Sequence, residues 1–168
     1  VGIAKIYTVI RNIKTLGAQN NEQSLPTMAC NEMDTNADTT ALGSNFVVLE
    51  YTMRTADVYS YNKLDAPIKD IPIVSGATAW TDPISDETYI LVFNEALYYG
   101  TRLDHTLINP NQIRAFGLPV YDNPYDNKNQ LSIHPDDNII IDMKTRGIKI
   151  YFETRSPTRS KLNECYHI

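Results

Sequence analysis

The chain has 168 residues, 42% of them hydrophobic and 21% charged, with a formal net charge of −5. This length fits one domain with a real hydrophobic core. The acidic balance, with no basic stripe, argues against binding to nucleic acid. No apolar run approaches the roughly 20 residues of a membrane helix, so we expect no membrane association.

The chain contains two cysteines, Cys30 and Cys165, which cannot build a disulfide framework. A reduced, intracellular and therefore cytoplasmic setting is the default expectation for such a chain. Because the first residue is Val1, we expect a processed product or a piece of a longer protein.

The opening stretch from Ile3 to Leu16 carries apolar residues at helical spacing and is followed by Gly17. This pattern predicts an N-terminal helix. The polar run 18–24 then predicts a loop. Residues 1–24 are therefore interpreted as an N-terminal appendage and linker.

From Leu25 onward the chain is rich in Tyr, Val, Ile and Thr, in short runs broken by Pro, Gly, Asn and Asp. This composition is typical of β-structure and predicts an all-β fold. The predicted strands are 28–33, 46–51, 57–61, 68–74 and 88–99.

Two helices and a hairpin are predicted after these strands. Asn109 as N-cap, Pro110 in the first turn and Gly117 as terminator predict a short helix over 109–117. Residues 138–143 and 148–153 predict a hairpin around a turn at 144–147. Ser156-Pro157 predicts the start of a C-terminal helix.

The motif that carries chemistry is Asp34-Thr35-Asn36-Ala37-Asp38, at the end of the first predicted strand. Small and hydroxylated residues after Asp34 suit a tight turn that presents a carboxylate. An aspartic protease needs such a carboxylate beside a second one, because two carboxyl groups that close share one proton. The ionised group activates a water, while the protonated group hydrogen-bonds the scissile carbonyl.

With this motif the chain resembles the retropepsin-like aspartic proteases, whose signature is Asp-Thr/Ser-Gly-Ala-Asp or -Ser. Within that family it is most similar to the proteases of copia-type retrotransposon polyproteins. Ile90 to Tyr99 resembles the strand that precedes their helix, and Leu107 to Ile113 resembles the run that opens it. The resemblance covers about residues 28–117.

The resemblance implies a role for each residue of the motif. Asp34 would be the catalytic aspartate, and Thr35 would hydrogen-bond the partner loop across a dimer axis. Asn36 occupies the position of the family's glycine, whose carbonyl faces substrate. Ala37 and Asp38 would belong to the substrate-binding wall, with Asp38 meeting the substrate backbone.

The resemblance also implies a flap between Asp57 and Trp80, with its tip within 65–72. Asp70, Ile71 and Pro72 would then contact the substrate. The implied fold is an acid-protease lobe, a closed β-barrel with a flap hairpin and one short helix. Residues 25–117 would form this core, and residues 118–168 a C-terminal extension packed on it.

Only one such motif is present, so a catalytic pair requires a homodimer. The function expected is aspartic endopeptidase cleavage of extended peptide segments, as in polyprotein processing, inside the cell or within retrotransposon particles. No metal or cofactor is implied, because the nucleophile is water. The alternative is a catalytically weak or inactive interaction or assembly domain with the protease fold, which Asn36 favours.

Other interpretations of the motif remain open. Asp34-x-Asn36-x-Asp38 matches the first half of an EF-hand loop, but Thr39 and Asn45 stand where that loop needs Gly and Glu. A purely structural Asx turn is a further alternative, since such runs are common turn chemistry. The three histidines share no metal-ligand spacing.

Overall fold

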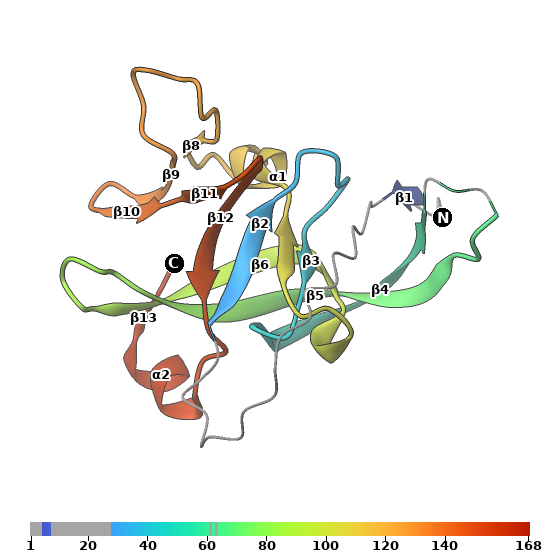
Figure 1. Ribbon diagram of the computed structural model, residues 1–168. Coiled ribbons are helices and arrows are strands. Elements are labelled where there is room, and N and C mark those ends of the chain that lie inside the picture. The colour runs from blue at the N-terminus through green and yellow to red at the C-terminus, as the bar shows by residue number, and fades with distance from the viewer. Residues whose placement is uncertain (1–4, 8–27, 61, 63) are drawn as a thin grey trace, which may run out of the picture.

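The computed structural model describes residues 5–7, 28–60, 62 and 64–168 (Figure 1). Within this part of the chain most residues lie in strands. Two short helices, α1 (Pro110–Ala115) and α2 (Arg159–Glu164), and a 3-10 turn, η1 (Gly100–Arg102), complete the elements. The predicted all-β class is confirmed.

Ten strands form the main sheet. In spatial order, nine of them are β1 (Lys5–Tyr7), β4 (Val47–Tyr59), β5 (Ile68–Thr81), β6 (Thr88–Tyr98), β3 (Ala41–Leu42), β7 (Thr106–Ile108), β2 (Ala29–Met33), β12 (Lys149–Thr154) and β11 (Lys144–Arg146). The tenth, β13 (Tyr166–His167), pairs with β6. A second sheet contains β10 (Ile139–Asp142), β9 (Ser132–Asp136) and β8 (Val120–Tyr121).

The predicted closed barrel is wrong. The main sheet begins at β1 and ends at β11, and these two edge strands do not pair. A single antiparallel bridge joins Ala79 of β5 to Arg155, with N–H···O distances of 2.9 and 3.0 Å. Beyond Arg155 the bridge does not continue, and Pro157, two residues later, has no N–H to donate to a further pair.

Of the predicted N-terminal helix, the structure describes only Lys5–Tyr7. These residues form strand β1 and not a helix. This strand pairs in parallel with β4, with Lys5 opposite Asp57. A parallel partner strand thus overrides the helical spacing at these residues. The rest of the predicted helix and the linker 18–24 lie outside the described residues.

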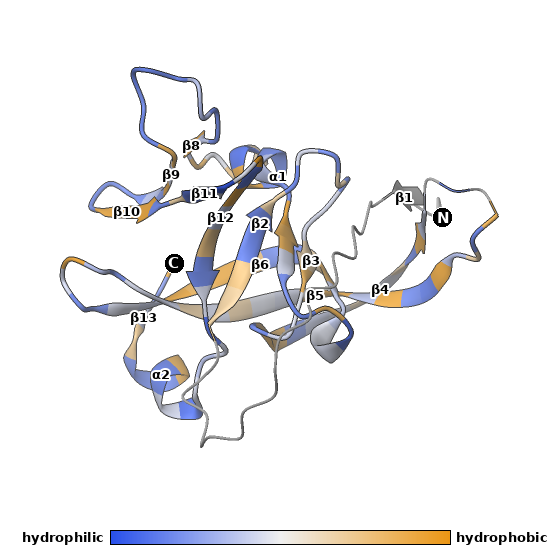
Figure 2. Ribbon diagram, viewed as in Figure 1, coloured by the Kyte–Doolittle hydropathy of each residue, from blue (hydrophilic) through white to orange (hydrophobic). Residues whose placement is uncertain are grey.

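The segment from Asp57 to Trp80, which the resemblance implies as the flap, belongs to a longer hairpin of β4 and β5. The two predicted strands 46–51 and 57–61 form one strand, β4, whose register shifts between Tyr51 and Arg54. Met53, with a φ of 60° and its side chain 92% exposed, lies at this irregularity. Figure 2 shows apolar and polar residues alternating in blocks along the hairpin.

The C-terminal hairpin differs from the prediction. Residues 144–146, expected in the turn, are strand β11, which pairs with β12. The turn is therefore tighter, with Gly147 at a φ of 62°, a conformation that glycine adopts without strain. Residues 139–142 form β10 and pair with β9 in the second sheet instead.

The strand β12 completes the main sheet beside the motif-bearing strand. It pairs antiparallel with β2, with Phe152 opposite Asn31 and Thr154 opposite Ala29. The C-terminal segment is thus part of the same sheet as β2, the strand that precedes Asp34. Its helix α2 begins later than predicted, because the Thr158 side chain, not that of Ser156, accepts the capping bond from the Lys161 N–H.

The largest hydrophobic cluster packs the main sheet against α1 and the second sheet. Buried members come from both halves of the main sheet, from α1 and from β9 and β10: Trp80, Leu91, Ile108, Ile113, Ile133, Ile141 and Phe152. The core therefore joins residues on both sides of the predicted boundary at 117.

A buried polar network links β2, β5, β7 and β12. Thr154 Oγ1 accepts from Asn31 Nδ2 at 3.0 Å and from Asn45 Nδ2 at 2.8 Å. Asn45 Oδ1 accepts from Thr106 Oγ1 at 2.8 Å, and the Asn45 carbonyl accepts from Thr78 Oγ1 at 2.9 Å. All five residues are at most 2% exposed. Buried amides require such partners, so the network fixes how these strands meet.

Candidate functional site

Asp34 follows the last residue of β2 and is half-buried. Its backbone N–H donates to the Ile108 carbonyl of β7 at 2.8 Å. Its Oδ1 accepts from the Asn36 N–H at 2.9 Å, which closes an Asx turn. Its second carboxylate oxygen, Oδ2, makes no hydrogen bond to any described residue and is free to bind a water or another carboxyl group.

The loop after Asp34 is held by the start of α1. The Asn109 side chain donates from Nδ2 to the Ala37 carbonyl at 2.8 Å, and its backbone N–H donates to Thr40 Oγ1 at 3.1 Å. Its Oδ1 also accepts from the Asn111 N–H at 2.8 Å. The predicted N-cap is therefore confirmed, and the same amide fixes the loop.

A second side chain of α1, Gln112, holds the other end of the loop. Its Oε1 accepts from the Thr40 N–H at 2.9 Å and from Thr39 Oγ1 at 3.2 Å. Its Nε2 donates to the carbonyls of Asn94 and Glu95, at 3.1 and 3.0 Å. Gln112 thus joins the loop to β6. Sequence reasoning missed Gln112, because its position three residues after the N-cap indicates only a capping-box bond to the N-cap N–H and not these four contacts.

Three motif residues are exposed at the rim of the loop: Thr35, Asn36 and Asp38. The Thr35 hydroxyl has no hydrogen-bond partner among the described residues. The φ of Asn36 is not positive, so its backbone does not need the glycine of the family signature. Ala37, in contrast, is buried at 3% exposure.

The predicted flap contacts lie in β5 and not in the segment between β4 and β5, of which residues 60, 62 and 64–67 are described. Asp70 is exposed, has a φ of 56° and donates its N–H to Asp57 Oδ1 at 3.2 Å. Pro72 is half-buried. Ile71 is fully buried in a cluster with Val58, so its side chain belongs to the hydrophobic core and not to an exposed contact surface.

An open hollow of ≈ 450 Å³ adjoins the loop. Asp38 and Thr39 line it from the loop, Ile73 from β5, and Glu95 from β6. Glu95 is also paired with Arg54 of β4 through both carboxylate oxygens. The pair is half-exposed and contributes little stability, but it places a cation and an anion at the edge of the hollow.

Cys30, four residues before Asp34, is half-buried on β2. Burial first, and the neighbouring Glu32 carboxylate second, raise the pKa of this thiol above its ordinary value. A thiol with a raised pKa is a poor nucleophile at neutral pH. The structure therefore does not favour thiol chemistry next to the motif.

Within the described residues no three His, Cys, Asp or Glu side chains come together as a metal site. No described helix is long and apolar enough to cross a membrane. No family model matches the chain, and no curated protein or solved structure is significantly similar to it.

Proposed function

We propose that the chain is a retropepsin-like aspartic endopeptidase, most similar to copia-type retrotransposon proteases, and that it works as a homodimer. The observation that carries the proposal is the placement of Asp34. Its carboxylate stands at a strand end on a loop anchored to β7 and α1, with one oxygen uncommitted. A catalytic carboxylate needs this rigid and accessible setting.

The order of elements along the chain also supports the proposal. The Asp34 loop is followed by the β4–β5 hairpin, then by β6 and then by the helix α1. This is the family's order of catalytic loop, flap, strand and helix. The closed barrel is not part of the support, because the main sheet is open.

A homodimer supplies the second carboxylate. One chain offers one Asp34, and an isologous contact about a two-fold axis brings two copies of the same loop together. The exposed Thr35, without a partner among the described residues, is available to hydrogen-bond the partner loop. Activity should therefore fall on dilution as the dimer dissociates.

The proposed reaction is hydrolysis of a peptide bond by water. The ionised Asp34 of one protomer takes a proton from the water, whose oxygen bonds to the scissile carbonyl carbon. The protonated Asp34 of the partner subunit hydrogen-bonds the carbonyl oxygen and supports the developing charge. The tetrahedral intermediate collapses as the amine leaves with a proton, and the dyad shares one proton again.

The hollow beside Asp38 and Thr39 gives an extended peptide a place to lie next to the dyad. An extended segment of a polyprotein would lie between the flap hairpin and the Asp34 loop and pair as an added strand. No metal or cofactor is required.

The direct test is cleavage of a mixed peptide library at acidic pH by the chain and by its Asp34→Asn variant. Asp137→Asn is the matched control, because Asp137 is exposed in the turn before β10 and makes no hydrogen bond to a described residue. The proposal expects cleavage by the wild type and the control only. Cleavage that survives Asp34→Asn, or no cleavage by any of the three, would overturn it.

One observation favours the alternative of a catalytically weak or inactive assembly domain. The side chain of Asn36 is exposed directly beside Asp34, where the family has a glycine. It places an amide in the space that a substrate would use. Absence of cleavage together with a stable dimer in sedimentation would favour this alternative.

A further inference from the structure

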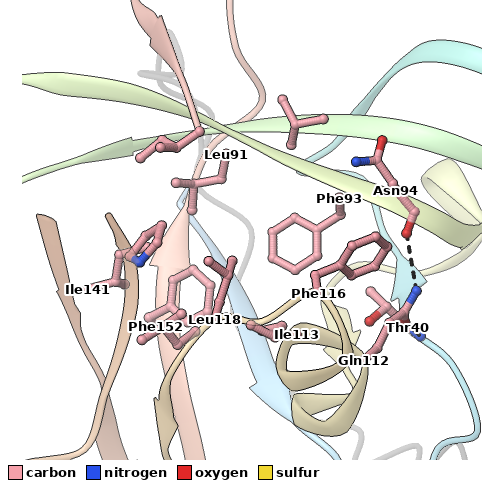
Figure 3. Close-up of a pocket in the computed structure, with 14 residues that line it drawn as sticks. Thr40, Leu91, Phe93, Asn94, Gln112, Ile113, Phe116, Leu118, Ile141 and Phe152 are labelled. Atoms are coloured by element: carbon pink, nitrogen blue, oxygen red, sulfur yellow. Dashed lines mark hydrogen bonds between the residues drawn. The ribbon is translucent and has the colours of Figure 1, made fainter. Parts of the chain in front are cut away.

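A separate cavity of ≈ 230 Å³ lies between the main sheet, α1 and the second sheet (Figure 3). Phe93 of β6, Phe152 of β12 and Phe116 at the end of α1 line it with aromatic rings. Ile133 and Ile141 line it from the second sheet. Among the described residues that form its wall, none has a charged side chain.

The size of the cavity limits its occupant. An apolar cavity of about 150 Å³ holds a benzene ring, so this one accepts a single ring with a small substituent. Ligands of drug size need roughly 300–1,000 Å³. The half-exposed ring of Phe116, 56% accessible, marks a route for entry.

The lining determines the chemistry of the occupant. A charged group would lose its hydration without gaining a partner, so the occupant is uncharged. Three phenylalanine rings favour an aromatic ring through edge and offset contacts. The backbone carbonyl of Asn94 lies at the edge of the cavity, where it accepts from Gln112 Nε2 at 3.1 Å.

The cavity shares a wall with the anchor of the Asp34 loop. Gln112 and Thr40 line it, and the Gln112 amide accepts the Thr40 N–H and donates to the Asn94 carbonyl, as the dashed line in Figure 3 marks. An occupant that packs against Gln112 restricts its side chain. The Thr40 hydrogen bond then opens less often.

We propose that this cavity binds a small, uncharged aromatic molecule and that binding stiffens the loop from Asp34 to Thr40. An effect on catalysis rests on the proposed function, whereas binding and loop stiffening do not. Because linkage is reciprocal, a stiffer loop should also raise the affinity for the ring.

The binding test uses the full chain and 4-fluorophenol, followed by fluorine NMR. We expect a saturable shift of the probe signal. Two variants fill the cavity: Leu118→Trp from the α1 side and Ile141→Phe from the second sheet. The binding test can be carried out if either of these two variants folds. Each should weaken binding by about tenfold or more. Ile84→Ala, at a residue 90% exposed and away from the cavity, should leave the affinity unchanged.

The stiffening test follows hydrogen exchange of the Thr40 amide. Saturating probe should slow this exchange by about threefold or more. Gln112→Ala should bind the probe more weakly and, at a probe concentration that saturates the variant, should show no slowing. No saturable binding, or full binding by both folded filled variants, would overturn the site. Unchanged Thr40 exchange would overturn the coupling. Neither measurement depends on peptide cleavage. A failure of the proposed protease function would be seen only in the Asp34→Asn cleavage assay, and a failure of the cavity proposal only in these two measurements.

Discussion

The side-chain amide of Asn109 serves two elements at once: its Oδ1 caps α1 through the Asn111 N–H, and its Nδ2 holds the Ala37 carbonyl at 2.8 Å. One buried side chain therefore ties the start of the helix to the middle of the Asp34 loop. Loss of the two hydrogen bonds should have separable effects, because one supports the helix and the other supports the loop.

Asn109→Ser and Asn109→Ala separate these effects. Serine keeps the helix cap but cannot reach Ala37, whereas alanine loses both bonds. We expect both to reduce peptide cleavage by about tenfold or more, because the loop loses its anchor. Alanine should cost about 1 kcal/mol more in the free energy of unfolding than serine. Urea unfolding and steady-state cleavage measure the two effects, and equal stability of the variants would contradict the capping role.

Asn36→Gly tests the side chain beside Asp34. Because the φ of Asn36 is not positive, glycine is not needed for the turn and should destabilise the chain by about 0.5–1 kcal/mol. Removal of the side chain should nevertheless raise kcat/KM by about threefold or more, since substrate gains room. A fall in kcat/KM would show that the amide of Asn36 helps substrate binding.

Thr154→Val tests the buried polar network without a change of shape. The hydroxyl accepts from both Asn31 and Asn45, and valine leaves one N–H of each amide without a partner. We expect a loss of about 2–4 kcal/mol in the free energy of unfolding. Thr145→Val, exposed on β11, is the matched control. Urea unfolding at one fixed protein concentration compares them, and equal midpoints would contradict the network's role.

The Cys30 thiol should make stability depend on alkaline pH. Burial raises its pKa in the folded chain above the ordinary value of 9.0. As pH rises past that value the unfolded chain loses the thiol proton first, so the free energy of unfolding falls until the folded thiol also ionises. Cys30→Ala should lose less stability than the wild type between pH 8 and pH 10. If urea unfolding shows that the wild type and Cys30→Ala lose the same free energy of unfolding over this pH range, the Cys30 thiol is not the cause of the loss.

The proposed dyad predicts a bell-shaped dependence of kcat/KM on pH, with its maximum on the acidic side of neutrality. Cleavage needs one proton shared by two carboxyl groups, so it falls when both are protonated and again when both are ionised. Initial rates across the pH range at a fixed dimer concentration measure it. A rate that rises steadily to alkaline pH would contradict the dyad.

Capping and turn residues in the sequence were sufficient to predict the helix α1 and the loop after β2. Asn109, Pro110 and Gly117 predicted α1, and the structure confirms its cap and its first turn. The motif loop after β2 was also located, because Asp34 comes directly after the predicted strand and small turn residues follow it.

Long-range pairing could not be predicted in the same way. Residues 138–143 and 148–153 have a hairpin pattern, yet β10 pairs with β9, and β12 pairs with both β11 and β2. The partner of β12 lies more than 100 residues earlier and is selected by buried contacts such as Asn31 to Thr154. Gln112 was missed for the same reason, since its four hydrogen bonds join segments far apart in the sequence.

The pairing of β2 with β12 also affects the stage of synthesis at which the Asp34 loop gains its full structural support. β2 precedes Asp34, but one of its two neighbours, β12, ends at Thr154, so β2 lacks this partner until residue 154 has been synthesised. Contacts between such distant segments slow folding. The proposed protease would then be inactive while residues 34–154 are being synthesised and would gain activity only after β12 has paired with β2.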